Sequence, residues 1–276
     1  MEVIKSSGER VIFNPNKIRK TLRRAGAKPE TVEKVIEAVI PLISDGMTTR
    51  QVFQVVRREL RKVSRRIANR YNLRNALLRL GPAGFKFEKY VASILTAYQY
   101  QTELPTDEMP GLCVRHEIDV IAKKNGRTVM IEAKFRNRFG DTVNLKDTMA
   151  TWAGFLDMVE GAKMGKCPKF DEVWIVTNGR FSERALQFGT CRGMHLVGWG
   201  AEEHSLPRLV DHAALYPITV LDDLRQWELD GFSENNLMLC REIADRDPAK
   251  LASQAKIDGD RAKKIVNACQ DVIAVD

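Results

Sequence analysis

The sequence lacks several features that would place the protein in a membrane or in an oxidising compartment. No apolar run approaches the roughly 20 residues of a membrane span, and no basic segment followed by an apolar one opens the chain as a secretory signal would. The five cysteines show no paired spacing, which argues against a zinc site or a disulfide framework. We therefore expect a cytoplasmic protein with reduced thiols and no membrane contact.

The charge of the chain is distributed unevenly. Residues 1–82 contain 19 Lys and Arg against 7 Asp and Glu, whereas residues 83–203 are balanced and residues 204–276 are slightly acidic. The densest basic run is RRELRKVSRRIANRYNLR at 57–74. A basic region of this kind usually binds a polyphosphate or a nucleic acid, although a solvated helix face would account for any single arginine.

Residues 115–136, RHEIDVIAKKNGRTVMIEAKFR, read as one β-hairpin. Asn125-Gly126 is a strong turn signal, because a type I′ turn needs a positive φ at both central residues. A two-residue turn also sets the register of the two strands. In that register Asp119 lies opposite Glu132.

Alternation along the two strands places Asp119, Glu132 and Lys134 on one face, together with Ile121 and Met130. Opposed carboxylates repel each other, and a hard divalent cation such as Mg²⁺ or Mn²⁺ would remove that repulsion. Lys134 would then point at the same phosphate and water. A solvated outer face with chance charges is the alternative explanation.

An Asp, a gap and then Glu-x-Lys on adjacent strands resembles the PD-(D/E)xK nucleases. The order of elements over about residues 83–203 resembles the catalytic domain of Mrr-like restriction endonucleases: a helix at 84–95, the hairpin, a helix, the apolar run WIVTN at 174–178 and another helix. The resemblance implies a restriction-endonuclease-like α/β core built on a mixed sheet.

The same resemblance assigns roles to individual residues. It implies that Asp119, Glu132 and the Ala133 carbonyl bind the metal ion, that Lys134 orients water and stabilises developing charge, and that Glu88 is an auxiliary acid. The sequence departs from the family in two places. Alanine stands where cysteine is frequent before the lysine, and the segment after the hairpin lacks a glutamine often found there.

The N-terminal region is predicted to form a hairpin at 3–13, turning around Ser7-Gly8, followed by four helices near 15–25, 29–44, 49–62 and 64–80. Residues that favour helix ends mark these boundaries: Asn14 or Asn16, Gly26, Thr48, Ser64 and Gly81-Pro82.

This order resembles the ATP-cone, the nucleotide-sensing module of ribonucleotide reductases and their repressors, over about residues 2–80. The resemblance implies a purine nucleoside triphosphate, ATP or dATP, bound by Lys5, Asn14, Lys17 and Arg74. Ser6-Ser7 and Val11 stand where the family often has further polar contacts. A basic docking surface that has lost the nucleotide is therefore the alternative.

Residues 204–276 read as wholly helical, and IDGDRAKKIV at 257–266 resembles the second half of a helix-hairpin-helix module. Such modules present backbone N–H groups to DNA phosphate. The net negative charge of this region equally suits protein docking or formation of a homodimer.

We therefore predict three domains: an ATP-cone-like domain at 1–82, an Mrr-like nuclease domain at 83–203 and a helical, helix-hairpin-helix-like domain at 204–276. The predicted activity is hydrolysis of DNA phosphodiesters by a metal-dependent endonuclease that responds to ATP or dATP. The alternatives are a nucleotide-responsive DNA-binding regulator without catalysis and a nuclease specific for junctions or flaps.

Overall fold

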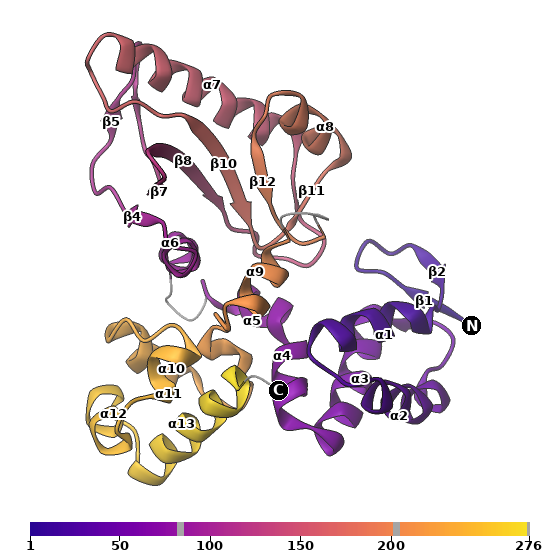
Figure 1. Ribbon diagram of the computed structural model, residues 1–276. Coiled ribbons are helices and arrows are strands. Elements are labelled where there is room, and N and C mark those ends of the chain that lie inside the picture. Colours follow the sequence, from indigo (N-terminus) through magenta and orange to yellow (C-terminus); the bar gives the residue numbers. More distant parts are fainter. Residues whose placement is uncertain (82–85, 201–204, 275–276) are drawn as a thin grey trace. The chain divides into compact units, whose positions relative to one another are not determined.

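The computed structural model describes residues 1–81, 86–200 and 205–274. The chain forms two compact units (Figure 1), one made of Met1–Gly84 with Ala214–Asp276 and the other of Phe85–Ala213. The predicted domain boundaries at 82/83 and 203/204 lie outside the described residues. The first and third predicted domains contribute to the same unit, so the middle of the chain interrupts that unit in sequence.

The N-terminal part of the first unit combines a small sheet with helices. The sheet has the strand order β2-β1-β3, in which β1 is antiparallel to β2 and parallel to β3. Its elements are β1 (Glu2–Ile4), β2 (Arg10–Ile12), α1 (Pro15–Arg24), α2 (Pro29–Val39), the 3₁₀ helix η1 (Ile40–Leu42), β3 (Met47–Thr48), α3 (Thr49–Val63), α4 (Arg65–Tyr71) and α5 (Leu73–Arg79).

The predicted helix starts are confirmed, but two predicted lengths are wrong. The side chains of Asn14, Thr48 and Ser64 cap α1, α3 and α4, respectively. The helix expected at 29–44 ends as an α-helix at Val39 and continues as η1. The helix expected at 64–80 is two helices that meet at Asn72.

The C-terminal part of the first unit is mainly helical, as predicted. It contains η2 (Ile218–Val220), α10 (Gln226–Glu234), α11 (Cys240–Ala244), α12 (Pro248–Ala255) and α13 (Gly259–Ile273). Within this unit, α13 packs on α4, and α5 packs on η2. Polar contacts join the two parts: the buried Asn72 amide donates to the Val220 carbonyl at 3.2 Å, and the buried Thr219 hydroxyl donates to the Ala76 carbonyl at 2.8 Å.

Several arginines of the basic run are engaged inside this unit. Arg57 and Arg61 both pair with Asp222, Arg57 at 2.7 Å. The Arg70 guanidinium donates to the Val272 carbonyl at 2.8 Å. Part of the positive charge in this run therefore binds the C-terminal segment, and fewer of its arginines are left for an external polyanion than the sequence suggests.

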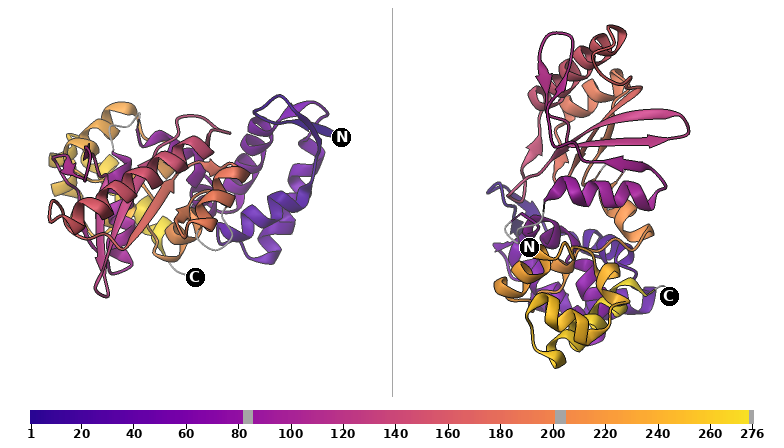
Figure 2. Two further views of the ribbon diagram at one scale, coloured as in Figure 1. Left: turned by 90° about the horizontal axis from the view of Figure 1, so that it is seen from above. Right: turned by 90° about the vertical axis from the view of Figure 1, so that its left-hand side faces the viewer.

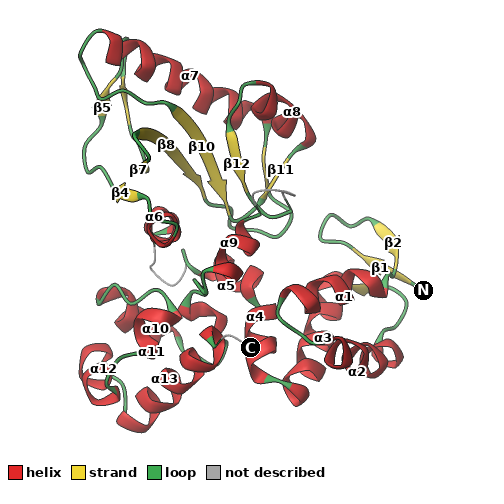
Figure 3. Cartoon of the chain, in the orientation of Figure 1, coloured by secondary structure: helices red, strands yellow, loops and turns green. Residues whose placement is uncertain are grey.

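The second unit is a mixed α/β structure (Figure 3). Its elements are α6 (Phe87–Ala97), β4 (Gln101–Glu103), β5 (Met109–Pro110), β6 (Arg115–His116), β7 (Val120–Lys124), β8 (Arg127–Lys134), β9 (Thr142–Val143), α7 (Leu145–Lys163), β10 (Glu172–Thr177), β11 (Arg180–Phe181), α8 (Glu183–Cys191), β12 (His195–Val197) and α9 (Leu206–His212). The main sheet has the order β12-β10-β8-β7-β4; β8, β10 and β12 are parallel, and β7 is antiparallel to both of its neighbours.

Helices cover both faces of this sheet (Figures 1 and 2). The helices α7 and α8 lie over one face and α6 over the other. Ile121 and Met130, which the sequence places on the polar face of the hairpin, are only 3% exposed and share a core with Phe155 and Met158 of α7. The middle of this face is therefore buried under α7, whereas Glu132 and Lys134 near the carboxyl end of β8 are partly exposed.

Two general expectations can be compared with the described residues. Within residues 1–81, 86–200 and 205–274, no helix is both long and apolar enough to cross a membrane. The five cysteines are free thiols.

Candidate active site

The β7–β8 hairpin has the predicted turn and register. Asn125 and Gly126 have φ values of 51° and 75°, which are the positive angles that a type I′ turn requires. Val120 pairs with Ile131, as the turn signal predicted. This register brings the residue that precedes β7 next to the carboxyl end of β8.

Asp119 immediately precedes β7 and receives a hydrogen bond from the Ala133 N–H at 2.7 Å. The pKa of Asp119 is raised to about 6, chiefly by burial; the carboxylates of Glu132 and Glu88 add to the shift, while the Ala133 N–H and the Lys134 ammonium oppose it. These effects show that Glu88, Glu132 and Lys134 all lie within electrostatic reach of Asp119. The structure thus brings the four predicted catalytic residues together.

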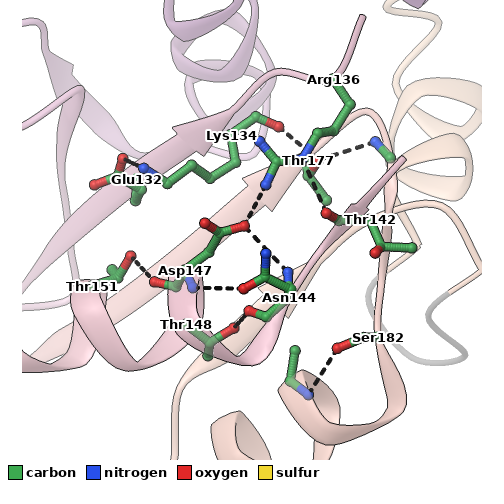
Figure 4. Close-up of polar contacts among 12 residues, drawn as sticks. Glu132, Lys134, Arg136, Thr142, Asn144, Asp147, Thr148, Thr151, Thr177 and Ser182 are labelled. Atoms are coloured by element: carbon green, nitrogen blue, oxygen red, sulfur yellow. Dashed lines mark hydrogen bonds and ion pairs between the residues drawn. The ribbon is translucent and has the colours of Figure 1, made fainter. Parts of the chain in front are cut away.

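Glu132 and Lys134 lie two residues apart on the same face of β8 and form an ion pair (Figure 4). Their side chains are 22% and 32% exposed, so solvent and ligands can reach both. The start of α6, which carries Glu88, lies beside the end of β8, because the rings of Phe87 and Phe135 are 5.6 Å apart. The carboxyl ends of parallel strands are the usual place for a ligand site in an open α/β sheet.

The predicted metal ligands are hard oxygen donors. Two carboxylates and a backbone carbonyl suit Mg²⁺, which commonly completes its coordination with water and substrate phosphate. Among the described residues, no group of three or more His, Cys, Asp or Glu could hold a metal ion. Metal binding by Asp119, Glu132 and the Ala133 carbonyl therefore stays a prediction, and it would require Glu132 to exchange its contact with Lys134 for the ion.

The raised pKa of Asp119 predicts a pH-dependent loss of stability in the metal-free protein. Its ordinary pKa is 3.8, so between about pH 4 and pH 6 the unfolded chain releases this proton before the folded chain does. Stability therefore falls as pH rises through this window and stays reduced above it. We expect the unfolding temperature of Asp119→Asn to exceed that of the wild type by more at about pH 8 than at about pH 5. An equal difference at both pH values would contradict this origin of the shift.

The end of β8 is fixed by side chains that the sequence analysis did not assign to the site. The buried Thr177 hydroxyl donates to the Lys134 carbonyl at 2.6 Å. The buried Asn178 side chain accepts a hydrogen bond from the Arg136 N–H at 2.7 Å and donates one to the Arg136 carbonyl at 2.9 Å. The backbone on the carboxyl side of Lys134 is therefore held by the end of β10.

The Arg136 side chain fixes the next part of the chain (Figure 4). Its guanidinium contacts Asp147 of α7 at 2.5 Å and the Thr142 carbonyl at 3.2 Å. Asp147 also forms a capping box with Asn144 at the start of α7. The Asn-x-x-Asp spacing of the cap and the Thr-Asn pair that ends WIVTN were visible in the sequence, but nothing local indicated their tertiary partners.

The four predicted nucleotide-binding residues lie on separate elements of the first unit. Lys5 lies in the turn between β1 and β2 and pairs with Glu9 at 2.8 Å. Asn14 and Lys17 lie at the other end of β2, at the start of α1. Arg74 is half-buried in α5. Their nucleotide-binding roles stay a prediction.

Two family models match this chain, one in its N-terminal part and one in its C-terminal part. The ATP cone domain model matches residues 1–76, and the model described as AF1548-like, C-terminal, matches residues 216–273. The predicted ATP-cone is thereby confirmed. Neither match includes residues 77–215, so the Mrr-like nuclease domain stays a prediction, as does the helix-hairpin-helix resemblance.

The chain is similar to a protein of Archaeoglobus fulgidus and to a crystal structure. An uncharacterized protein of that organism is 33% identical over 184 residues, which are 66% of this chain and 99% of the relative. A crystal structure described as that of a protein of unknown function, AF1548, has 32% sequence identity and a TM-score of 0.55, covering 68% of this chain and 97% of that chain.

Proposed function

This chain belongs to the AF1548-like family, and we propose that it is a metal-dependent endonuclease that hydrolyses DNA phosphodiesters under the control of a nucleotide bound to its ATP-cone. The second unit would then be a restriction-endonuclease-like core of the Mrr-like type. One observation carries the proposal: Asp119, Glu132, Lys134 and Glu88 lie close together at the carboxyl end of β8. Two carboxylates and a lysine in that arrangement suit hydrolysis of a phosphodiester.

Each residue has a distinct role in this proposal. A divalent cation bound by Asp119, Glu132 and the Ala133 carbonyl would supply an activated water and neutralise phosphate charge. Lys134, released from Glu132, would offset negative charge that develops on the phosphate and orient the attacking water. Glu88 would act from the first turn of α6 as an auxiliary acid. The raised pKa of Asp119 means that this carboxyl must lose its proton before it can bind a cation.

The direct test is incubation of the full chain with supercoiled plasmid in Mg²⁺ or Mn²⁺. We expect conversion to open-circular and linear forms, and no conversion with chelator or with Glu132→Gln. Glu160→Gln is the matched control, because Glu160 is an exposed acid on α7. Wild-type protein that binds DNA without cutting it in either metal would replace this proposal with that of a nucleotide-responsive DNA-binding regulator.

The ATP-cone supports control by a purine nucleoside triphosphate. Lys17 is exposed in the first turn of α1, where a phosphate can reach its ammonium from solvent. Lys5 already has a carboxylate partner in Glu9, so a nucleotide would have to displace that contact. Lys17 is therefore the better of the two lysines for testing the site.

We expect ATP or dATP to bind the wild-type chain in a calorimetric titration, and Lys17→Ala to weaken binding about tenfold, because one charge-assisted contact to phosphate is lost. Added salt should weaken wild-type binding more than that of the variant. Lys20→Ala is the matched control, since Lys20 is an exposed lysine on the same helix. Equal affinity in Lys17→Ala and wild type would place the phosphates elsewhere, and failure of both triphosphates to bind at millimolar concentration would remove nucleotide control.

A further inference from the structure

The solvent-facing side of α7 carries a narrow line of side chains, which we call the α7 stripe. It consists of five exposed residues at spacings of three and four: Lys146, Met149, Ala153, Leu156 and Glu160. Residues at these spacings lie in one line along a helix. Met149 is 49% exposed and Leu156 is 42% exposed. The middle of the stripe is therefore apolar, and its two ends carry opposite charges.

The side of α7 that packs on the main sheet (Figure 1) is a different one. Phe155 and Met158 are buried on that side and belong to the core of the second unit. Packing within the unit thus accounts for the buried side of the helix but not for the α7 stripe. A line of apolar residues at alternating spacings of three and four is typical of a helix that packs against a second helix.

The α7 stripe is complementary to an antiparallel copy of itself. Lys146 and Glu160 each lie seven residues from Ala153, so an antiparallel copy that crosses at Ala153 brings Lys146 near the partner's Glu160. Met149 then faces the partner's Leu156. In the part of the chain that the structure describes, neither Lys146 nor Glu160 forms an ion pair. A surface that matches itself in this way is what a two-fold interface between identical chains requires.

The shape of the α7 stripe suits this arrangement as well. Ala153 has a short side chain, so two helices can approach closely where they cross. Met149 and Leu156 lie on either side of that point, and both would leave water when the second helix binds. An apolar centre between charged ends has the anatomy of a protein–protein interface.

We propose that a second copy of this chain binds across α7, antiparallel to it, with the two-fold axis at Ala153. The apolar centre supplies the attraction, and the two contacts between Lys146 and Glu160 set the orientation. A parallel copy would place like charges side by side at both ends of the stripe, which is unfavourable. The inference does not depend on the proposed nuclease, whose residues all come from one copy.

The first test is the oligomeric state of the full chain by sedimentation equilibrium. We expect a reversible monomer–dimer equilibrium, weakened roughly tenfold by Lys146→Glu or by Glu160→Lys, because each reversal creates a like-charge contact on both sides of the axis. The double variant exchanges the two charges and should recover wild-type affinity. Lys123→Glu is the matched control, since Lys123 is an exposed lysine on β7.

A cysteine at the axis gives a second test, in a chain whose exposed Cys113 and Cys191 are replaced by serine. Two copies of Ala153→Cys should be joined by a disulfide on oxidation with diamide, because Cα atoms within about 7 Å of each other can be bridged. Glu160→Cys is the control: its two copies would lie roughly 20 Å apart along the paired helices and should stay unlinked.

Three results would overturn the inference. The first is a wild-type chain that sediments as a monomer at every concentration, whatever part of the same chain covers the α7 stripe. The second is a dimer that neither charge reversal weakens. The third is a double variant that stays as weak as the single ones, which would exclude the antiparallel pairing of Lys146 with the partner's Glu160.

Discussion

In the proposed nuclease, Lys134→Met is expected to slow metal-dependent DNA cleavage by about 10²- to 10³-fold, because it removes the positive charge assigned to stabilise the developing phosphate charge. Methionine keeps an unbranched apolar stem of similar length, so the packing around the end of β8 is retained. Glu132 loses its ion-pair partner but remains 22% exposed, and water can solvate its carboxylate. The unfolding temperature should therefore change little, which separates a catalytic effect from a folding defect.

The measurement for Lys134→Met is the single-turnover cleavage rate at saturating protein. Lys123→Met is the matched control, because Lys123 is an exposed lysine on the neighbouring strand β7. It should cut DNA at the wild-type rate. Cleavage by Lys134→Met within a factor of about two of wild type would be incompatible with the stabilising role assigned to this lysine.

Asp222→Ala is expected to destabilise the first unit by about 3 kcal/mol, because it leaves a largely buried arginine without its carboxylate. Arg57 is 15% exposed and Asp222 is 23% exposed. The loss of stability should therefore lie at the low end of the roughly 3–5 kcal/mol that breaking a buried ion pair costs. Among the described residues, Nε and Nη2 of Arg57 have no hydrogen-bond partner. Burial lowers the pKa of Arg57, and Asp222 opposes that shift, which identifies this carboxylate as the group that makes the buried charge tolerable.

A double variant tests the same explanation. Arg57→Met in the Asp222→Ala background should recover most of the lost stability, because an apolar side chain of similar length has no charge to desolvate. Differential scanning calorimetry would report the loss and its recovery. Hydrogen exchange in η2 and α13 would confirm that the change lies in the first unit. A double variant as unstable as Asp222→Ala would show that the cost does not arise from the unpaired guanidinium.

Local sequence signals predicted the parts of the fold that depend on neighbouring residues. Asn125-Gly126 set both the turn and the register of the hairpin, because few other residues accept two successive positive φ angles. Asn14, Thr48 and Ser64 set the starts of three helices through side-chain caps. The approach of Asp119 to β8 followed directly from that register.

The features that the sequence did not predict depend on distant partners. The break between α4 and α5 coincides with the buried Asn72, whose amide bonds a carbonyl 148 residues away. No local pattern marks such a contact. Likewise, alternation placed Ile121 and Met130 on the face of Asp119 and Glu132, but it carries no information about the helix α7 that covers them. The fixing of Arg136 by Asn178 was missed for the same reason.

The interruption of the first unit by the second has a consequence for synthesis of the chain. After α5 has been made, the ribosome must add about 190 residues before α13 is complete, which takes roughly 10–40 s at typical elongation rates. The carbonyls of Val220 and Val272, which accept hydrogen bonds from Asn72 and Arg70, are made only late in that interval, and Val272 only at its end. The Asn72 amide and the Arg70 guanidinium in the ATP-cone therefore stay hydrated until the inserted unit and the C-terminal helices have been translated.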